Sequence, residues 1–143
     1  MNKPPKSTEE HLTHSEKETC LLAEGLAQSF KGKEVVLLTG ELGAGKTVFA
    51  KGIASGLGLK DINQVCSPSY TLVNIYQARY TIFHVDLYRL GKESEIEDLG
   101  WEDYLEEGVV IVEWAEKIKF SLEGIHIAIT MGEGDERKIT ISF

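Results

Sequence analysis

Residues 40–47 read Gly-Glu-Leu-Gly-Ala-Gly-Lys-Thr, which has the spacing of a phosphate-binding loop: glycine, four residues, then glycine, lysine and threonine. Such a loop needs a strand before it and a helix after it. Residues 34–39 form an apolar run typical of a buried strand, and residues 46–57 carry apolar side chains at helical spacing. The pattern therefore predicts an α/β domain and disfavours a plain glycine-rich turn.

Each position of this loop has a physical role around a nucleoside triphosphate. Gly43 and Gly45 can adopt positive φ, and the backbone N–H groups form an anion-binding nest at the start of a helix. Lys46 would reach the β- and γ-phosphates, and the Thr47 hydroxyl would ligate Mg²⁺. We therefore expect ATP and Mg²⁺ as cofactors, with ATP held by Glu41, Leu42, Gly43, Ala44, Gly45, Lys46, Thr47 and Val48.

The length of 143 residues fits one domain. Residues 1–12 are mostly polar and are expected to be a frayed tail, which leaves residues 13–143 as the domain. No apolar run approaches the roughly 18 residues that a membrane span needs. The two cysteines are far apart and the N-terminus lacks the apolar core of a signal peptide, so we expect a reduced, cytoplasmic protein.

The formal net charge is −8, and only three arginines are present, scattered along the chain. Nucleic-acid binders usually carry a basic stripe, so direct binding of nucleic acid is not expected. The acidic residues cluster at 93–107 and 133–136. These clusters are either solvated faces or a docking surface for a basic partner.

The remaining pattern predicts a P-loop NTPase-like fold: a mixed, mostly parallel sheet flanked by helices on both faces, with antiparallel hairpins. Capping boxes at Ser15–Glu18 and Ser94–Glu97 predict two helix starts. The other expected elements are a hairpin of strands 72–76 and 80–86, short helices at 95–99 and 101–106, a central strand at 109–112, and a terminal hairpin of 125–129 with 139–143.

Two acidic residues end apolar strands. Asp86 follows residues 82–85 and Glu113 follows residues 109–112. Carboxylates at strand ends face the crevice where open α/β sheets bind ligands, so either could bind Mg²⁺ or assist hydrolysis. A turn cap and a rim salt bridge are the plainer alternatives. The predicted catalytic set is Lys46, Asp86 and Glu113, and the predicted metal ligands are Thr47, Asp86 and Glu113.

Other residues are candidates for a switch or a partner contact. The segment around Ser67, Ser69 and Thr71 could place a hydroxyl near γ-phosphate, although a proline turn with capping hydroxyls is also possible. Trp114 could stack on a nucleotide or a partner, or pack in the core. His84 should face the same side as Asp86, and a structural histidine is the favoured interpretation.

The motifs, taken in order, resemble one family. They are the loop at 40–47, Ser-Pro-Ser-Tyr-Thr-Leu-Val at 67–73, His-Val-Asp-Leu-Tyr-Arg-Leu at 84–90, and Glu-Trp at 113–114. Together they resemble the TsaE (YjeE) family of bacterial ATPases, which are required to form threonylcarbamoyladenosine in tRNA. The similarity spans roughly residues 15–117.

The resemblance implies an ATPase that is weak alone and works with TsaB and TsaD, where TsaD transfers the threonylcarbamoyl group and tRNA is met only through the complex. It implies Mg²⁺ held by Thr47 and Glu113, with Asp86 as the strand-end acid. It also implies that Ser15 to Thr19 lies near adenine and Arg137 near the nucleotide. The family usually has threonine in place of Ser69 and proline in place of Ala115. The resemblance therefore does not fix the geometry of the loop after Trp114.

The phosphate-binding loop also occurs in proteins with three other functions. A small-molecule kinase would need several arginines and a lid segment. A GTP switch would need an Asn-Lys-x-Asp string, which is absent from the sequence. A non-enzymatic regulator that only binds nucleotide is compatible with the sequence.

Overall fold

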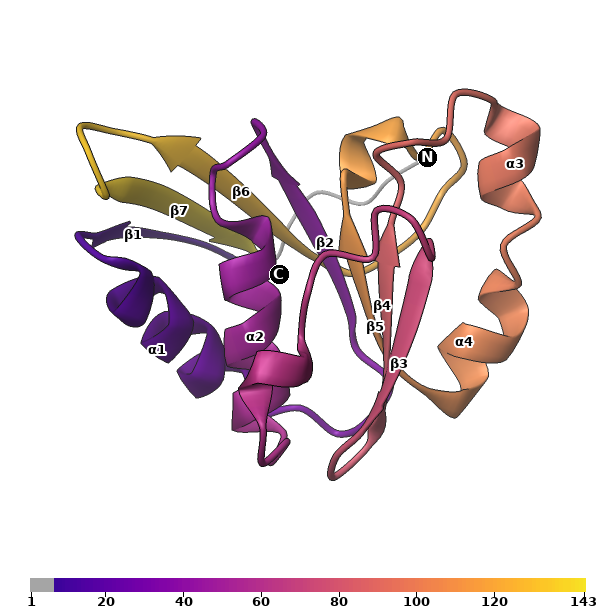
Figure 1. Cartoon of the computed structure of the whole chain (residues 1–143), viewed down its shortest axis with the longest axis horizontal. Coiled ribbons are helices and arrows are strands. Elements are labelled where there is room, and N and C mark those ends of the chain that lie inside the picture. Colours follow the sequence, from indigo (N-terminus) through magenta and orange to yellow (C-terminus); the bar gives the residue numbers. More distant parts are fainter. Residues whose placement is uncertain (1–6) are drawn as a thin grey trace.

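The structure is a computed structural model that describes residues 7–143. One sheet of seven strands runs through it in the order β1-β7-β6-β2-β5-β4-β3 (Figure 1). The strands are β1 (Thr8–Thr13), β2 (Val35–Gly40), β3 (Val73–Gln77), β4 (Thr81–Asp86), β5 (Gly108–Glu113), β6 (Ile125–Met131) and β7 (Arg137–Ser142). The helices are α1 (Glu16–Ala27), α2 (Lys46–Gly56), α3 (Glu93–Glu97) and α4 (Trp101–Glu107), with short 3₁₀ turns η1 (Ile62–Gln64) and η2 (Ala115–Lys117).

The predicted fold class is confirmed. The centre of the sheet is parallel, since β2 pairs with β5 and β6, and β5 pairs with β4. Antiparallel pairs form its two sides: β3 with β4, β6 with β7, and β7 with β1. The parallel pairing places the carboxyl ends of β2, β4 and β5 at one edge, which is where a ligand site is expected in such sheets.

Helices cover both faces of the sheet. One hydrophobic cluster joins α1 and α2 to side chains such as Val36, Leu38 and Ile111. A second cluster joins α3 and α4 to the alternate side chains of the same strands, such as Leu37 and Val110. All six residues of β5 are buried, as the apolar run predicts for a strand inside the sheet.

The helices α1 and α2 approach each other closely because small residues face each other. A Cβ built on Gly56 would lie 2.5 Å from the Glu24 carbonyl oxygen and 2.8 Å from the Ala27 Cβ. Gly52 has the same relation to the backbone of Cys20 and to Ala23. This contact fixes α2, whose first turn carries the end of the phosphate-loop motif.

Two expectations for helix starts have different outcomes. At α1, the Ser15 hydroxyl accepts a hydrogen bond from the Glu18 N–H at 3.1 Å, and the Glu18 carboxylate accepts one from the His14 N–H at 2.8 Å. The capping box predicted at Ser94 is wrong. The cap of α3 is Lys92, which makes no side-chain capping bond, so the helix begins before Ser94 and covers 93–97 rather than 95–99.

The predicted frayed tail is wrong for residues 8–12, whereas residues 1–6 lie outside the described part of the chain. Residues Thr8–Thr13 form the edge strand β1, which pairs with the whole of β7 from Thr8↔Ser142 to Thr13↔Arg137. Backbone hydrogen bonds hold this strand, because only Thr13 among its six residues is buried. No helix in residues 7–143 is long and apolar enough to cross a bilayer.

Candidate functional site

A cleft of about 420 Å³ opens at the carboxyl ends of β2, β4 and β5. Its walls come from the loop after β2, the first turn of α2, the segment before β3, and the residues that end β4 and β5. The lining residues are Glu16, Leu42, Gly43, Gly45, Lys46, Thr47, Val48, Ser67, Ser69, Asp86, Tyr88, Glu113 and Trp114. The cleft thus brings together most of the residues that the sequence predicts for a nucleotide site.

The loop has the conformation that its glycines predict. Gly43 has φ of 83° and Gly45 has φ of 110°, and α2 begins at Lys46 directly after Gly45. A Cβ at either of these two positions would meet no protein atom within 4 Å, so the need for glycine there is conformational. Gly40 differs, because its Cβ would lie 2.7 Å from the Ile129 carbonyl oxygen of β6.

Lys46 is buried and turned back onto its own loop. Its ammonium donates hydrogen bonds to the carbonyl oxygens of Gly40 at 2.6 Å and Glu41 at 2.9 Å. The same nitrogen lies 4.1 Å from the centre of the Trp114 ring. Burial lowers the pKa of Lys46 below its ordinary value of 10.5, while the nearby carboxylates of Glu113, Glu116 and Asp86 oppose that shift.

Thr47 and Glu113 meet at the base of the cleft. The Thr47 hydroxyl lies 3.1 Å from each carboxylate oxygen of Glu113, so it donates to that carboxylate. The Glu113 Oε2 atom is also 2.5 Å from Nε2 of His84, and both side chains are buried. His84 therefore belongs to the site as a residue that orients Glu113, and its Nδ1 atom has no partner among the described residues.

Asp86 lies beside Glu113, because the two residues are register partners in the parallel pair of β4 and β5. Its Oδ2 atom accepts hydrogen bonds from the hydroxyls of Ser67 at 2.7 Å and Ser69 at 3.2 Å. Its Oδ1 atom accepts from the Tyr88 N–H at 2.9 Å. Thr71 does not join this group, since its hydroxyl donates to the Asn74 side chain at 2.8 Å and it does not line the cleft.

Trp114 adopts a left-handed backbone conformation, with φ of 62°, directly after β5. This turn lays the half-buried indole across the cleft, between the Lys46 ammonium and the Tyr88 ring, whose centroid is 5.0 Å away. The residue after it, Ala115, begins the η2 turn. The tryptophan thus lines the cleft and is not part of the deep core.

Arg137 lies against the outer side of the loop. Its Nε donates to the Ala44 carbonyl oxygen at 2.9 Å, and Nη2 donates to that of Gly43 at 3.4 Å. A narrow cavity of about 30 Å³ lies here, lined by Glu16, Thr19, Gly43, Ala44, Gly45, Val48, Asp135 and Arg137. Thr19 therefore does lie beside the loop, whereas Ser15 caps α1 and lines neither cavity.

Several lining residues were not predicted from the sequence. Tyr88, Glu16 and Asp135 line the two cavities, and the Glu116 carboxylate accepts a hydrogen bond from the Gly40 N–H at 3.4 Å. Tyr88 could have been found, since it follows Asp86 by two residues on a segment that must pass the cleft. The other three lie within three residues of predicted site residues, Glu16 after Ser15, Glu116 after Glu113 and Asp135 before Arg137, but no motif marks their own side chains.

The oxygen donors suit a hard divalent cation. No group of three or more His, Cys, Asp or Glu residues within 7–143 is arranged to hold a metal ion. Two hard oxygen ligands, the Thr47 hydroxyl and the Glu113 carboxylate, nevertheless lie together beside the loop. A magnesium ion typically uses one or two protein oxygens and completes its shell with phosphate and water, so this donor set fits Mg²⁺.

The fold and this site define a P-loop NTPase-like α/β protein. The model of one family, described as threonylcarbamoyl adenosine biosynthesis protein TsaE, matches residues 13–139. The chain therefore belongs to the TsaE family.

Relatives named tRNA threonylcarbamoyladenosine biosynthesis protein TsaE are similar over most of the chain. The protein of Bacillus subtilis (strain 168) is 41% identical over 134 residues, which cover 91% of this chain and 82% of that protein. That of Aquifex aeolicus (strain VF5) is 39% identical over 133 residues, covering 92% and 94%. That of Rickettsia conorii is 40% identical over 129 residues, covering 90% and 73%. A crystal structure of Bacillus subtilis YdiB superposes with a TM-score of 0.77 at 34% identity, covering 95% of this chain and 85% of that one.

Proposed function

We propose that the chain binds ATP with Mg²⁺ in the 420 Å³ cleft and hydrolyses it as a step in tRNA threonylcarbamoyladenosine formation. The link to this modification comes from membership of the TsaE family. The proposed partners are TsaB and TsaD, with tRNA met only through their complex, and the proposed location is therefore the cytoplasm.

One observation carries the proposal. The hydroxyl of the loop threonine, Thr47, donates to the Glu113 carboxylate, and Asp86 is the register partner of Glu113. A protein that needed only to hold phosphate would require the loop and its lysine. Two buried acids beside the threonine are what cation-assisted hydrolysis requires in addition.

The two acids take different roles in this proposal. Glu113 is oriented from both sides, by Thr47 and by His84, so its carboxylate is fixed where Thr47 would also bind the cation. Mg²⁺ bound there would neutralise charge on the β- and γ-phosphate oxygens. Asp86 lies next to Glu113 in the sheet and accepts the hydroxyls of Ser67 and Ser69, so it is suited to orient water or the segment that carries the two serines.

Lys46 has to change its contacts before it can bind phosphate. Its ammonium now donates to two carbonyls of its own loop and lies over Trp114. Phosphate oxygens would compete for the same nitrogen with full negative charge, which makes stronger charge-assisted hydrogen bonds than neutral carbonyls do. This rearrangement gives a physical reason for weak activity alone and for stimulation by partners that stabilise the extended side chain.

A small-molecule kinase is less well supported. Transfer to a metabolite calls for arginines that clamp the moving phosphate. The lining of the cleft includes no arginine within the described residues. Arg137 lies at the neighbouring cavity and donates to loop carbonyls, and the Arg89 guanidinium lies 4.1 Å from the Tyr70 ring centre.

Hydrolysis by the reconstituted complex tests the proposal. Wild-type protein, Thr47→Ala and Glu113→Gln would each be mixed with purified TsaB and TsaD, and phosphate release from ATP measured. We expect each variant to lose about 100-fold or more, because each removes a group that acts on the charge of the transition state. The matched control is Thr71→Ala, which removes a hydroxyl outside the cleft. Unchanged hydrolysis in Thr47→Ala or Glu113→Gln would refute the proposed roles.

A further inference from the structure

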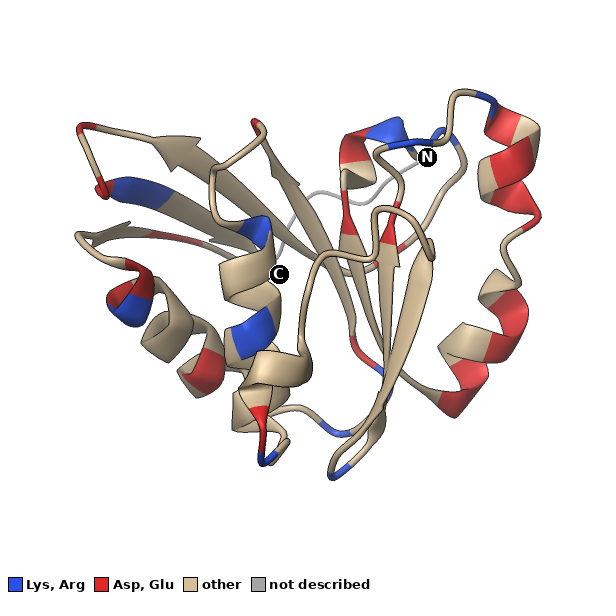
Figure 2. Cartoon of the chain, in the orientation of Figure 1, with Lys and Arg blue, Asp and Glu red and all other residues tan. Residues whose placement is uncertain are grey.

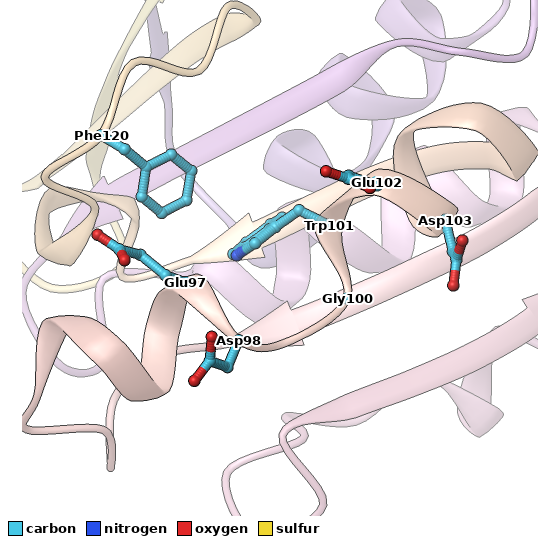
Figure 3. Close-up of a pocket in the computed structure, with 7 residues that line it drawn as sticks. All are labelled: Glu97, Asp98, Gly100, Trp101, Glu102, Asp103 and Phe120. Carbon is cyan, nitrogen blue, oxygen red and sulfur yellow. The ribbon is translucent and has the colours of Figure 1, made fainter.

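A second cavity, of about 400 Å³, lies between α3, α4 and the segment before β6 (Figure 3). Trp101 and Phe120 form its aromatic part, with ring centroids 5.8 Å apart in an edge-to-face arrangement. The Trp101 N–H donates to the Ile96 carbonyl oxygen at 2.6 Å, which fixes the orientation of the indole. Glu97, Asp98, Glu102 and Asp103 line the same cavity (Figure 3). Acidic residues and aromatic side chains therefore share it.

The charge around this cavity is not balanced within the chain. Residues 93–107 hold eight carboxylates and no lysine or arginine, and the whole chain has a formal net charge of −8, so the rest of the sequence is neutral. Figure 2 shows the acidic residues spread along α3 and α4. None of these eight carboxylates forms an ion pair with another described residue. Their charge is therefore available to a partner.

Charge complementarity selects the kind of partner. Nucleic acid and the same face of a second copy would both be repelled by this surface. A bound metal ion is disfavoured, since no set of three acidic, histidine or cysteine ligands occurs among residues 7–143. A lysine or arginine side chain fits both features of the cavity, because its cationic end pairs with carboxylates while its stem or guanidinium plane packs on aromatic rings.

We propose that the cavity bounded by Glu97, Asp98, Trp101, Glu102, Asp103 and Phe120 is the docking site for a basic surface of a protein partner, with one lysine or arginine side chain entering beside Trp101. The identity of that partner rests on the proposed function, which calls for TsaB and TsaD. The position is suitable, because α3 and α4 connect β4, which ends at Asp86, to β5, which ends at Glu113. A partner bound there would contact the chain segment that joins the strand of Asp86 to the strand of Glu113.

Charge reversal tests this site. The cavity variant is Glu97→Lys with Glu102→Lys, and the matched control is Glu123→Lys with Glu133→Lys, which changes the net charge equally at exposed carboxylates outside residues 93–107. Binding to purified TsaB–TsaD would be measured by calorimetry. We expect the cavity variant to bind about tenfold or more weakly and the control within about threefold of wild type. ATP hydrolysis by each chain alone should match wild type, and a melting curve would confirm that both variants fold.

The outcomes separate the site from the function. Equal loss of TsaB–TsaD binding in both variants, or no loss in either, would overturn the docking site. Binding of the wild type would in that case still support the proposed function. If the wild type does not bind TsaB–TsaD, the choice of partners fails, and a fluorescent tetra-arginine peptide becomes the probe. Peptide binding lost only in the cavity variant would support the site, and binding that is absent or equal in all three would overturn it. If the cavity variant unfolds, Glu97→Gln with Glu102→Gln should weaken binding in the same direction, and unchanged binding would overturn the site.

Discussion

Gly52 on α2 offers a sharp test of the packing that holds the phosphate loop. A Cβ at this position would lie 2.6 Å from the Ala23 Cβ and would also overlap the Cys20 carbonyl oxygen of α1. Real Cβ atoms do not approach other atoms so closely, so Gly52→Ala must push α1 away from α2. Backbone, and not a flexible side-chain end, is what has to move.

The magnitude follows from two opposing effects. Alanine in place of glycine gains about 1 kcal/mol of helix propensity. Overpacking a tight contact costs about 1–3 kcal/mol, and the upper end applies because the obstacle is backbone. The net loss of unfolding free energy is about 1–2 kcal/mol, which lowers the melting temperature of a chain of this size by roughly 3–8 °C.

Gly25→Ala is the matched control. Gly25 lies on α1, and a Cβ there would meet nothing within 4 Å. The same substitution should therefore stabilise the protein by about 0.5–1 kcal/mol, with a melting temperature roughly 2–4 °C higher. Both variants would be melted beside wild type and followed by circular dichroism. If Gly52→Ala melts at or above the wild-type temperature, the close contact of α1 and α2 is wrong.

Three further predictions concern the cleft and the loop that borders it. Ser67→Ala removes the 2.7 Å hydrogen bond to Asp86 and should slow phosphate release with TsaB–TsaD about tenfold. Thr71→Ala should change the rate of phosphate release less than about twofold. Equal effects of the two substitutions would contradict the placement of the two hydroxyls. Lys46→Met should raise stability near pH 7, because the lowered pKa means that the folded state holds the charged Lys46 ammonium less favourably than the unfolded chain does. Wild-type stability should rise with pH between that lowered pKa and 10.5, so the urea midpoints of wild type and Lys46→Met should converge in this range. A difference in midpoint that does not change with pH would refute burial of the Lys46 charge as the cause. Arg137→Gln should cost about 1 kcal/mol by calorimetric melting, through the lost bonds to the Ala44 and Gly43 carbonyls, and an unchanged melting temperature would show that these bonds are not stabilising.

Much of the site could be predicted because its signals are local. The loop at 40–47 fixes the strand before it and the helix after it, and apolar runs ending in Asp86 and Glu113 mark two strands, which the structure shows to be parallel neighbours. The parallel pairing then brings both acids to one edge. Each motif is recognised within its own segment, whereas the pairing of β4 with β5 is a contact between residues far apart in the sequence.

What could not be predicted depends on contacts far apart in the sequence. The edge strand β1 has only one buried residue, so it carries no hydrophobic alternation and its pairing with β7 is invisible locally. Ser94 has the spacing of a capping box, but α3 begins two residues earlier than predicted, with Lys92 at the cap position, and the Ser94 cap does not form. The Lys46 ammonium bonds to its own loop and lies over the Trp114 ring, and no sequence pattern marks either these bonds or the left-handed turn at Trp114.

The central claim is that Thr47 and Glu113 hold a cation beside a bound triphosphate. The most direct test is calorimetric titration of ATP into wild type and into Glu113→Gln, each with Mg²⁺ and with a chelator. We predict that Mg²⁺ tightens ATP binding to wild type by about tenfold or more, and that Glu113→Gln removes most of this difference. ATP binding to wild type that is equally tight with and without Mg²⁺, or a Mg²⁺ effect unchanged in Glu113→Gln, would contradict the account.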